Sequence, residues 1–272
     1  MRIAFQTKQS NISKELEEKM RQALGQEAFT FTEEKPELVI SIGGDGTMLH
    51  AFHRYQALLN DLRFVGVHTG HLGFYADWQA DEWPTLVQMI KQDAGESVSY
   101  PLLHVACYRG GHIEHQELAL NESSLRRLEG TMTCEIYLQG QFFELFKGDG
   151  LSIATPTGST GLNKSLGGAV VHPSLNSMQL TEIASINNRV YRSLASSILL
   201  SPEEELTVRF KKHERSGTHL FVDHLHEPLG DWDAITFQIA KARMHFANYR
   251  HIPFWRRVRD SFIADTWEVD DA

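Results

Sequence analysis

The hydrophobic period of the chain changes near Tyr100-Pro101, and this change constrains the fold more than any other feature. Before it, segments with strand-like and helix-like periods alternate, which favours α/β layers around a parallel sheet. We expect strands at 3–7, 37–42 and 63–67, and helices at 13–24, 48–59 and 81–91. After it the period is nearer two, and we expect strands at 117–120, 206–210, 219–222 and 235–240, with a hairpin over 135–146.

These patterns predict two domains and a returning segment. A chain of 272 residues is long enough for one large core or two modest ones. We expect a Rossmann-like α/β N-terminal domain over 1–100, with a glycine-rich loop after a strand, and a mainly β C-terminal domain over 101–248. Residues 249–272 form a C-terminal segment, helical at 254–263, that packs back on the first domain.

The charge and cysteine content exclude several classes of protein. Twenty-six Lys and Arg residues against 35 Asp and Glu give a formal net charge of −9, which disfavours nucleic acid and anionic membranes as partners but leaves room for a local anion site. Cys107 and Cys134 are too few for a disulfide scaffold and lack zinc-site spacing, so we expect reduced, buried thiols. The polar N-terminus and the lack of any long apolar run favour a cytoplasmic protein.

Gly43-Gly44-Asp45-Gly46-Thr47 is the strongest local signal. It stands between a predicted strand and a predicted helix, with Thr47 as the expected N-cap. Glycine lets backbone N–H groups converge on an anion, and a helix N-terminus adds partial positive charge, so the segment is a candidate phosphate loop. It has the spacing of neither a P-loop nor a dinucleotide fingerprint. A carboxylate inside an anion cradle repels phosphate unless it handles a proton or a metal, which suggests that Asp45 is a base in phosphoryl transfer. A plain βα turn remains an alternative.

A second cluster of small polar residues lies in the β-rich half. Gly148-Asp149-Gly150 precedes Thr155-Pro156-Thr157-Gly158-Ser159-Thr160, and the composition is typical of a loop that wraps a polar ligand. A long structural loop is the alternative. Asn121-Glu122 offers an amide for an adenine edge and a carboxylate for ribose hydroxyls.

Taken together in this order and spacing, these motifs resemble the bacterial NAD kinases, and the resemblance spans most of the chain. Further matches are His68-Thr69-Gly70-His71-Leu72-Gly73-Phe74, Gly167-Gly168 and His172-Pro173. The glycine-rich motif alone is shared with lipid kinases and phosphofructokinases, whereas the threonine-rich one is more specific. The resemblance implies the NAD kinase fold and phosphorylation of the adenosine ribose 2′-hydroxyl of NAD by ATP to give NADP.

The resemblance also assigns residues. Asp45 would be the general base, and Gly43, Gly44 and Gly46 would cradle the donor phosphates. The NAD-binding residues it implies are Gly46, Phe74, Asn121, Glu122, Lys147, Asp149, Thr157, Thr160, Gly161, Leu162, Asn163, Lys164, Ser165 and Ala184. A divalent metal ion, Mg²⁺, would arrive with ATP, without a metal site made by the protein. Inorganic polyphosphate is an alternative donor, and a homodimer or homotetramer is implied.

One position departs from the family pattern. Gly161-Leu162 replaces the Ala-Tyr that usually follows the Ser-Thr pair. Leu162 keeps an apolar surface but lacks a ring for stacking and a phenolic hydroxyl. A non-catalytic NAD sensor is therefore a competing hypothesis, as is a lipid or sugar kinase that shares only the glycine-rich motif.

The remaining polar clusters carry weaker signals. Among the fourteen histidines the close pairs lack an H-E-x-x-H motif, so we expect packing or surface roles rather than zinc, although His71 and His224 can line a cleft. We interpret the basic cluster of Arg250, His251, Arg256, Arg257 and Arg259 as a solvated or subunit-contacting helix face, and we expect the acidic tail at 265–271 to be solvated.

Overall fold

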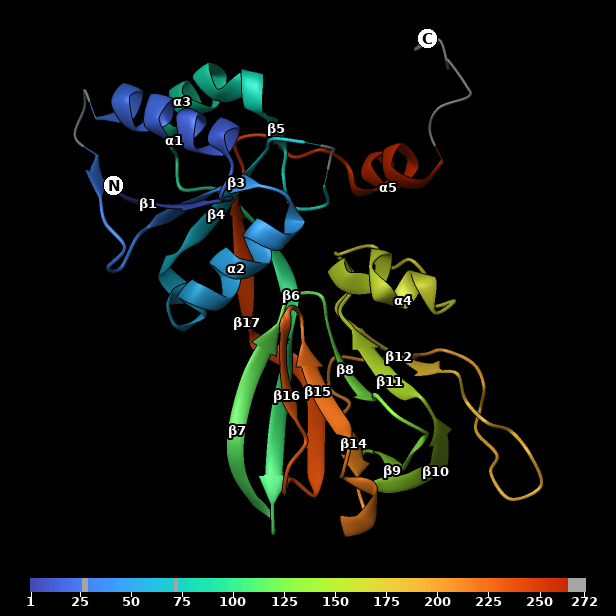
Figure 1. The fold of residues 1–272 in the computed structure, drawn as a ribbon. Coiled ribbons are helices and arrows are strands. Elements are labelled where there is room, and N and C mark those ends of the chain that lie inside the picture. The colour runs from blue at the N-terminus through green and yellow to red at the C-terminus, as the bar shows by residue number, and fades with distance from the viewer. Residues whose placement is uncertain (26–28, 71–72, 264–272) are drawn as a thin grey trace. The chain divides into compact units, whose positions relative to one another are not determined.

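The chain passes from one structural unit to another after Ser99 and returns after Arg243 (Figure 1). The computed structural model describes residues 1–25, 29–70 and 73–263. The first unit holds residues 1–99 together with the chain from Met244 onward, and the second holds 100–243. We expected the return to begin at residue 249. The chain rejoins the first unit earlier, at Met244, because Phe246 pairs with Phe64 of that unit. Phe246 lies in a strand that ends at Ala247.

A parallel sheet forms the centre of the first unit, as the alternating pattern predicts. Its strand order is β17-β4-β3-β1-β2, with the short β5 beside β4. The strands are β1 (Arg2–Thr7), β2 (Thr30–Phe31), β3 (Leu38–Gly43), β4 (Arg63–His68), β5 (Trp78–Gln79) and the end of β17 (Ala234–Ala247). Every residue of β3 is buried, as expected for a central parallel strand.

Helices follow the strands of this unit. They are α1 (Asn11–Leu24), α2 (Asp45–Tyr55), α3 (Trp83–Lys91) and α5 (Phe254–Phe262), with short 3₁₀ turns η1 (Gln56–Asp61) and η2 (Ala80–Glu82). Ser10 caps α1, since its hydroxyl accepts the Ser13 N–H at 3.3 Å. The apolar residues that predicted α1, Leu16, Met20 and Leu24, are its buried face.

One detail of the sequence prediction is wrong in this unit. Gly44, not Thr47, is the N-cap of α2, and the helix begins at Asp45. Thr47 N–H already donates to the Gly44 carbonyl at 2.9 Å. Gly44 can take the extended cap conformation without a side-chain hydrogen bond, and this brings Asp45 into the first turn of the helix.

The second unit is mainly β. One sheet is antiparallel, in the order β13-β12-β11-β8-β15-β16. Its strands are β8 (Glu122–Arg127), β11 (Gly150–Ala154), β12 (Met178–Ile183), β13 (Ile198–Leu200), β15 (Thr218–Val222) and β16 (Leu225–Pro228). The other strands of the unit are β6 (Ser97–Arg109), which enters it from the first unit, β7 (His112–Ala119), β9 (Met132–Leu138), β10 (Gln141–Gly148), β14 (Leu206–Arg209) and most of β17. Short helical turns are η3 (Thr157–Thr160), α4 (Leu162–Ser165) and η4 (Lys212–Glu214).

The predicted hairpin over 135–146 is present as β9 and β10. Gln139 and Gly140 form its turn with φ of 50° and 72°. Positive φ at both central residues matches the right-handed twist of the flanking strands.

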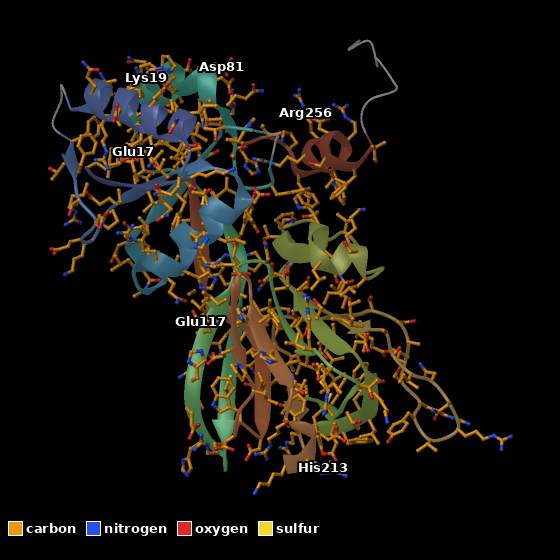
Figure 2. All side chains as sticks on the ribbon, viewed as in Figure 1. Glu17, Lys19, Asp81, Glu117, His213 and Arg256 are labelled. Carbon is orange, nitrogen blue, oxygen red and sulfur yellow. The ribbon has the colours of Figure 1, made fainter. Side chains whose placement is uncertain are left out.

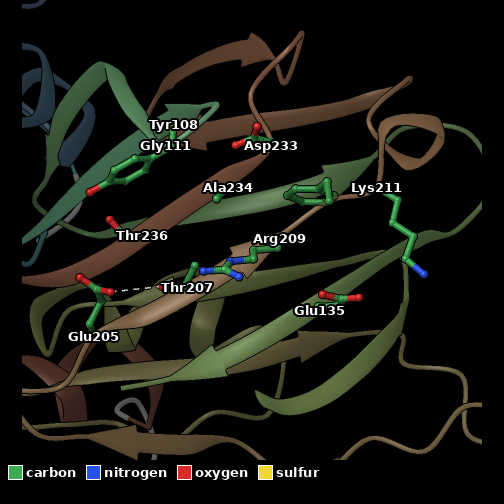
Figure 3. A pocket seen from close by; sticks show the side chains of 11 residues that line it. Tyr108, Gly111, Glu135, Glu205, Thr207, Arg209, Lys211, Asp233, Ala234 and Thr236 are labelled. Carbon is green, nitrogen blue, oxygen red and sulfur yellow. Dashed lines mark hydrogen bonds between the residues drawn. The ribbon is translucent and has the colours of Figure 1, made fainter. Parts of the chain in front are cut away.

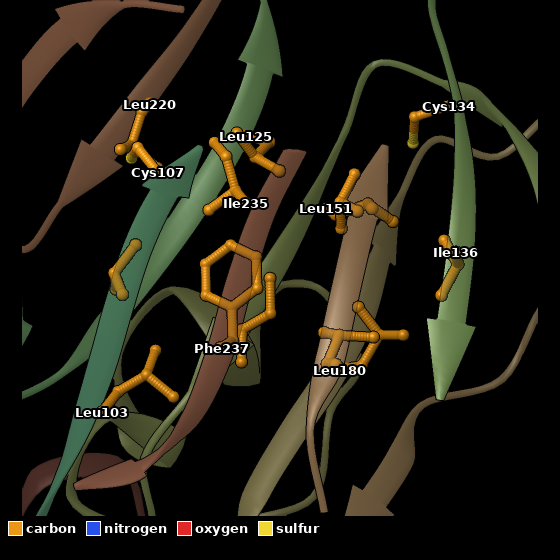
Figure 4. Packing of buried hydrophobic residues seen from close by; sticks show 14 of the residues in the cluster. Leu103, Cys107, Leu125, Cys134, Ile136, Leu151, Leu180, Leu220, Ile235 and Phe237 are labelled. Atoms are coloured by element: carbon orange, nitrogen blue, oxygen red, sulfur yellow. The ribbon is translucent and has the colours of Figure 1, made fainter. Parts of the chain in front are cut away.

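Apolar side chains from both sheets of the second unit form one core (Figure 4). Leu125, Leu151 and Leu180 come from the six-stranded sheet and meet Ile136 and Phe237 from the other strands. The two cysteines lie in this core as free thiols. Burial raises the pKa of Cys107 to about 12 and that of Cys134 well above its ordinary value, so both are unreactive.

Within the described residues, the helices are all too short or too polar to span a lipid bilayer.

Candidate functional site

Asp45 stands where a fully buried strand becomes a helix. β3 ends at Gly43, Gly44 caps α2, and Asp45 is its first residue, half-buried. The free N–H groups of a first helical turn make this an anion-attracting position, and a carboxylate there is favourable.

Both carboxylate oxygens of Asp45 accept backbone hydrogen bonds from one loop. Phe74 N–H donates to Oδ2 at 2.9 Å, and Tyr75 N–H donates to Oδ1 at 3.1 Å. A Cβ at Gly73 would stand 2.2 Å from Asp45 Oδ1, so only glycine allows this approach. The orientation of the carboxylate is therefore fixed by the main chain of residues 73–75.

The glycines of the G-G-D-G-T loop have different roles. A Cβ at Gly43 would stand 2.2 Å from Thr47 Oγ1, so this glycine is required by packing. At Gly44 and Gly46 a Cβ would meet nothing within 4 Å. These two backbones face a pocket of about 530 Å³ whose lining includes Lys8 and His50. The loop thus offers open main chain beside a lysine.

The C-terminal helix binds the loop that holds Asp45, and one expectation from the sequence is wrong here. Arg257 is only 3% exposed, so it is not part of a solvated helix face. It donates to the Gly73 carbonyl at 3.0 Å and the Ala76 carbonyl at 2.9 Å, and it forms an ion pair with Asp77. Asp77 also accepts the Ile252 N–H at 2.9 Å.

Arg250 is a second contact of the C-terminal segment with this region. Its guanidinium lies 4.0 Å from the centre of the Trp78 ring and pairs with Glu82. The hydrogen bond from Arg250 lowers the pKa of Glu82 to about 2. Arg256 and Arg259 keep exposed side chains, as expected for them (Figure 2 labels Arg256).

Phe74, an expected NAD contact, packs on the same helix. Its ring centre lies 6.4 Å from that of Phe254 and 5.9 Å from that of Phe262. Its role toward NAD stays a prediction. His71 and Leu72 of this loop, and the acidic tail at 265–271, lie outside the described residues.

In the second unit, strand pairing brings the two predicted NAD-binding motifs together. β11 pairs antiparallel with β8, which sets Ala154 opposite Glu122. Thr155 then donates its hydroxyl to the Leu120 carbonyl at 2.6 Å and its N–H to the Asn121 carbonyl at 2.8 Å. A Cβ at Gly158 would stand 2.0 Å from the Asn121 oxygen, so the threonine-rich loop lies directly on Asn121.

Asp223, which was not among the residues predicted from the sequence, organises the same place. Its carboxylate accepts the N–H groups of Leu120, Asn121 and Glu122 at 2.9, 2.8 and 3.2 Å. Asp223 has φ of 52° in the two-residue turn between β15 and β16. An aspartate between two short strand-like segments is a turn signal, and this feature of the sequence could have pointed to Asp223.

Two buried polar atoms in this region have no hydrogen-bond partner within the described structure: Glu122 Oε2 and Thr157 Oγ1. Burial, together with the charge of Asp223, raises the pKa of Glu122 to about 7. Unpaired buried polar atoms cost free energy and are typical of places where a ligand supplies the missing partner.

The residues after the Ser-Thr pair have distinct environments. A Cβ at Gly161 would lie 3.6 Å from Glu122 Oε2, an ordinary contact distance, and Leu162 is half-buried. Asn163 is fully buried, with its amide bonded to the Ser159 and Ala169 carbonyls and to the Thr181 hydroxyl. Asn163 therefore anchors the loop internally, and its expected contact with NAD stays a prediction.

The other expected NAD residues of this unit lie on several segments. Lys147, on β10, places its ammonium 4.5 Å from the Tyr191 ring centre. Asp149 is exposed between β10 and β11, and Ala184 follows β12 with φ of 47°. Ala184 lines a pocket of about 550 Å³ with Gly167. The rest of the set are Lys164 and Ser165, which are exposed, and Thr160, which is buried.

A further pocket of about 580 Å³ in the second unit contains none of the predicted residues (Figure 3). Tyr108, Arg209, Lys211 and Asp233 line it. In the part of the chain that the structure describes, no group of three or more His, Cys, Asp or Glu side chains is arranged to hold a metal ion.

The chain matches two family models in sequence. Residues 2–94 match the ATP-NAD kinase N-terminal domain, and residues 118–250 match the ATP-NAD kinase C-terminal domain. The NAD kinase of Lacticaseibacillus paracasei is 51% identical over 246 residues, covering 90% of this chain and 92% of that protein. The NAD kinase of Latilactobacillus sakei is 47% identical over 99% of this chain and 100% of its own length.

Solved structures share the fold. A yeast NADH kinase complexed with NADH has a TM-score of 0.81 at 18% identity, covering 98% of this chain and 89% of that one. An NAD kinase from Archaeoglobus fulgidus in complex with ATP has a TM-score of 0.73 at 21% identity, covering 96% and 99%. The architecture expected from the sequence, α/β followed by mainly β, is confirmed.

Proposed function

This chain belongs to the NAD kinase family, and we propose that it transfers the γ-phosphoryl group of ATP to the 2′-hydroxyl of the adenosine ribose of NAD, giving NADP. Matches over both domains favour this activity over a lipid or sugar kinase, which would share only the glycine-rich motif. The observation that carries the mechanism is the Asp45 carboxylate, held by two backbone N–H groups at the start of α2.

In the proposed reaction Asp45 accepts the proton of the ribose 2′-hydroxyl. Phosphoryl transfer proceeds through a loose transition state, so the protein contributes mainly position and electrostatics. Within the described structure each Asp45 oxygen accepts one backbone N–H, and a carboxylate oxygen has a further lone pair with which to accept a proton. A fixed carboxylate meets the requirement for a well-placed proton acceptor.

The donor phosphates would bind along the main chain of Gly44 and Gly46. This proposal is supported by the open space over both glycines, by the adjacent helix N-terminus, and by Lys8 in the lining of the same pocket. Gly43 would act indirectly, by letting the loop close on Thr47.

The adenosine part of NAD would bind at Asn121, Glu122 and the threonine-rich loop. The unpaired Glu122 Oε2 and Thr157 Oγ1 support this, because hydroxyl groups of a ribose would supply their missing partners. The wider set named from the sequence, from Lys147 to Ala184, stays part of the proposal.

We also propose that Mg²⁺ enters as its complex with ATP. Mg²⁺ prefers oxygen ligands and commonly keeps several waters while binding substrate phosphates, so it can enter without a metal site made by the protein. The metal would offset repulsion between the phosphates and Asp45.

The compartment and the oligomeric state of the enzyme are further parts of the proposal. We propose a cytoplasmic homodimer or homotetramer. Two free thiols, Cys107 and Cys134, suit a reducing compartment. The mass in solution, measured by light scattering, tests the assembly.

The decisive experiment gives the purified protein NAD, ATP and Mg²⁺ and measures NADP with an NADP-specific dehydrogenase. Parallel reactions replace ATP with inorganic polyphosphate and NAD with NADH. We expect NADP with ATP. Thermal stabilisation by NAD without product from any donor would instead identify a non-catalytic sensor.

A further inference from the structure

We propose that Arg257 is a positioning residue for catalysis: by binding the two ends of the loop over residues 73–76, it fixes the N–H groups that orient the Asp45 carboxylate. The inference rests on the proposed function, since it assigns Asp45 the role of base. Arg257 would not contact either substrate and would act only through the loop.

Arg257 is hydrogen-bonded to both ends of the loop that orients Asp45. Arg257 binds the carbonyls of Gly73 and Ala76 at 3.0 and 2.9 Å. Between these two carbonyls lie Phe74 and Tyr75, whose N–H groups hold the two oxygens of Asp45. One guanidinium therefore fastens both ends of the short segment that orients the base. The planar, multiply donating guanidinium suits this task, because it can serve several acceptors in fixed geometry.

The Arg257 side chain is also buried. Arg257 is 3% exposed, and its charge is balanced by Asp77, which closes the far side of the same loop. A buried ion pair often contributes no more net stability than apolar residues of similar volume, so stability alone does not explain this pair. Here the geometry concerns a loop in direct contact with Asp45, where a Cβ at Gly73 would already overlap the carboxylate.

Apolar packing holds the rest of the loop in place. Tyr75 stacks on Phe246 with ring centres 5.9 Å apart and planes 1° from parallel, and a Cβ at Gly66 would stand 2.2 Å from the Tyr75 carbonyl oxygen. The Tyr75 side of the loop is thus fixed by packing against the sheet of the first unit. Arg257 binds the Gly73 and Ala76 carbonyls, which this packing does not hold.

The test compares three variants with the wild type. Asp77→Asn/Arg257→Met removes the anchor and leaves no unpaired buried charge. Arg257→Lys keeps the charge with a shorter reach and fewer donors. Arg256→Met, on the same helix with an exposed side chain, is the matched control. Each is measured well below its melting temperature, per mole of folded enzyme.

We expect kcat of the double variant to fall about 100-fold, as misplacement of a reacting group by about 1 Å does, while KM for NAD and for ATP stays within about threefold. Arg257→Lys should give an intermediate kcat and Arg256→Met the wild-type value. A merely structural role would lower the melting temperature but leave kcat per folded molecule unchanged, and that result overturns the inference.

A second readout does not require turnover. Hydrogen–deuterium exchange of a peptide spanning residues 73–78 should be about tenfold faster in the double variant than in Arg256→Met, because the loop loses its anchor and its Phe74 and Tyr75 amides separate more often from the Asp45 carboxylate. Equal exchange in the two variants overturns the inference even if the wild type makes no NADP. Faster exchange with an inactive wild type would overturn the proposed function and leave the anchoring of the loop supported.

Discussion

The carboxylates of Asp45 and Glu122 differ in their hydrogen-bond partners. Both oxygens of Asp45 accept backbone N–H groups, and the donors are themselves fastened by Arg257. Glu122 Oε2 is buried with no partner in the described structure, and burial raises the pKa of Glu122 to about 7. Asp45 is thus oriented before any substrate binds, whereas Glu122 lacks a partner that a substrate hydroxyl can provide.

This difference suggests a division of labour between the two units. A base for phosphoryl transfer must be in place at the transition state, so its orientation is best fixed by the protein. A recognition site gains selectivity when its buried polar groups are satisfied only by the correct ligand. Five predictions test the division, from the largest expected effect to the smallest.

Asp45→Asn should separate chemistry from recognition most clearly. We expect kcat to fall by a factor of about 10²–10⁴, the usual contribution of a general base, with little change in the dissociation constant of NAD. The melting temperature should change by a few degrees only, since one of the two side-chain oxygens that accept a backbone N–H is lost. Steady-state kinetics and isothermal calorimetry measure both quantities. Asp61→Asn, at an exposed position of the same unit, is the control.

Gly158→Ala should damage the recognition loop. A Cβ there would stand 2.0 Å from the Asn121 oxygen and 2.4 Å from its carbon, so the backbone must move. We expect a loss of about 1–3 kcal/mol in unfolding free energy and a large rise in KM for NAD.

Gly161→Ala is the matched control for Gly158→Ala. Its Cβ would meet its nearest neighbour at 3.4 Å, an ordinary contact. The free energy of unfolding should therefore stay near the wild-type value. Equal effects of the two substitutions would contradict the tight packing of the threonine-rich loop on Asn121.

Glu122 should make NAD binding depend on pH. An ionised carboxylate accepts from a hydroxyl more strongly than a protonated one, so KM for NAD should fall, by up to about tenfold, between pH 6 and pH 8 as the ionised fraction rises through a pKa of about 7. Glu122→Gln should remove this dependence, and Glu129→Gln, exposed nearby, should keep it.

The same group predicts a stability change of opposite sense. A carboxyl whose pKa is raised on folding stabilises the fold below its unfolded pKa of about 4.5, and that contribution is lost as pH rises through 7. The wild type should therefore lose more unfolding free energy than Glu122→Gln between pH 5 and pH 8. A steeper loss in the variant would show that Glu122 is not the group responsible.

Leu162→Tyr should give the smallest effect. It restores the aromatic residue usual in the family, and one added aromatic contact of about 1 kcal/mol would lower KM for NAD roughly fivefold. Leu175→Tyr, at a position 54% exposed, is the control and should leave KM unchanged. An unaltered KM in Leu162→Tyr would mean that this side chain does not face the adenine.

Local patterns were enough to predict the helices and the main strands of the first unit, whereas in the six-stranded sheet of the second unit they predicted β15 alone. Leu16, Met20 and Leu24 defined α1, and Gln139-Gly140 defined the hairpin turn, because helix period and turn chemistry depend on neighbours in sequence. The N-cap of α2 was misplaced, because Thr47 and Gly44 both suit a cap and only the path of β3 decides between them.

The candidate site was predictable where the motif itself carries the chemistry. Asp45, Asn121, Glu122 and Thr157 were all selected from composition and family resemblance. Arg257 was assigned to a solvated face, since a cluster of arginines on a short helix gives no sign of which one is buried. Asp223 was not selected, because a lone aspartate in a turn looks like any other turn residue.

The sequence by itself determined the order of the layers, the glycine-rich turn that carries Asp45, and the small polar residues of the recognition loop. Only the tertiary structure decided that Phe74 and Tyr75 hold the base, that Arg257 anchors them, and that Glu122 Oε2 has no hydrogen-bond partner among the described residues. The physical reason is range. Turns and periods are set by residues a few positions apart, whereas these contacts join segments about 30 to 180 positions apart, whose meeting depends on the whole fold.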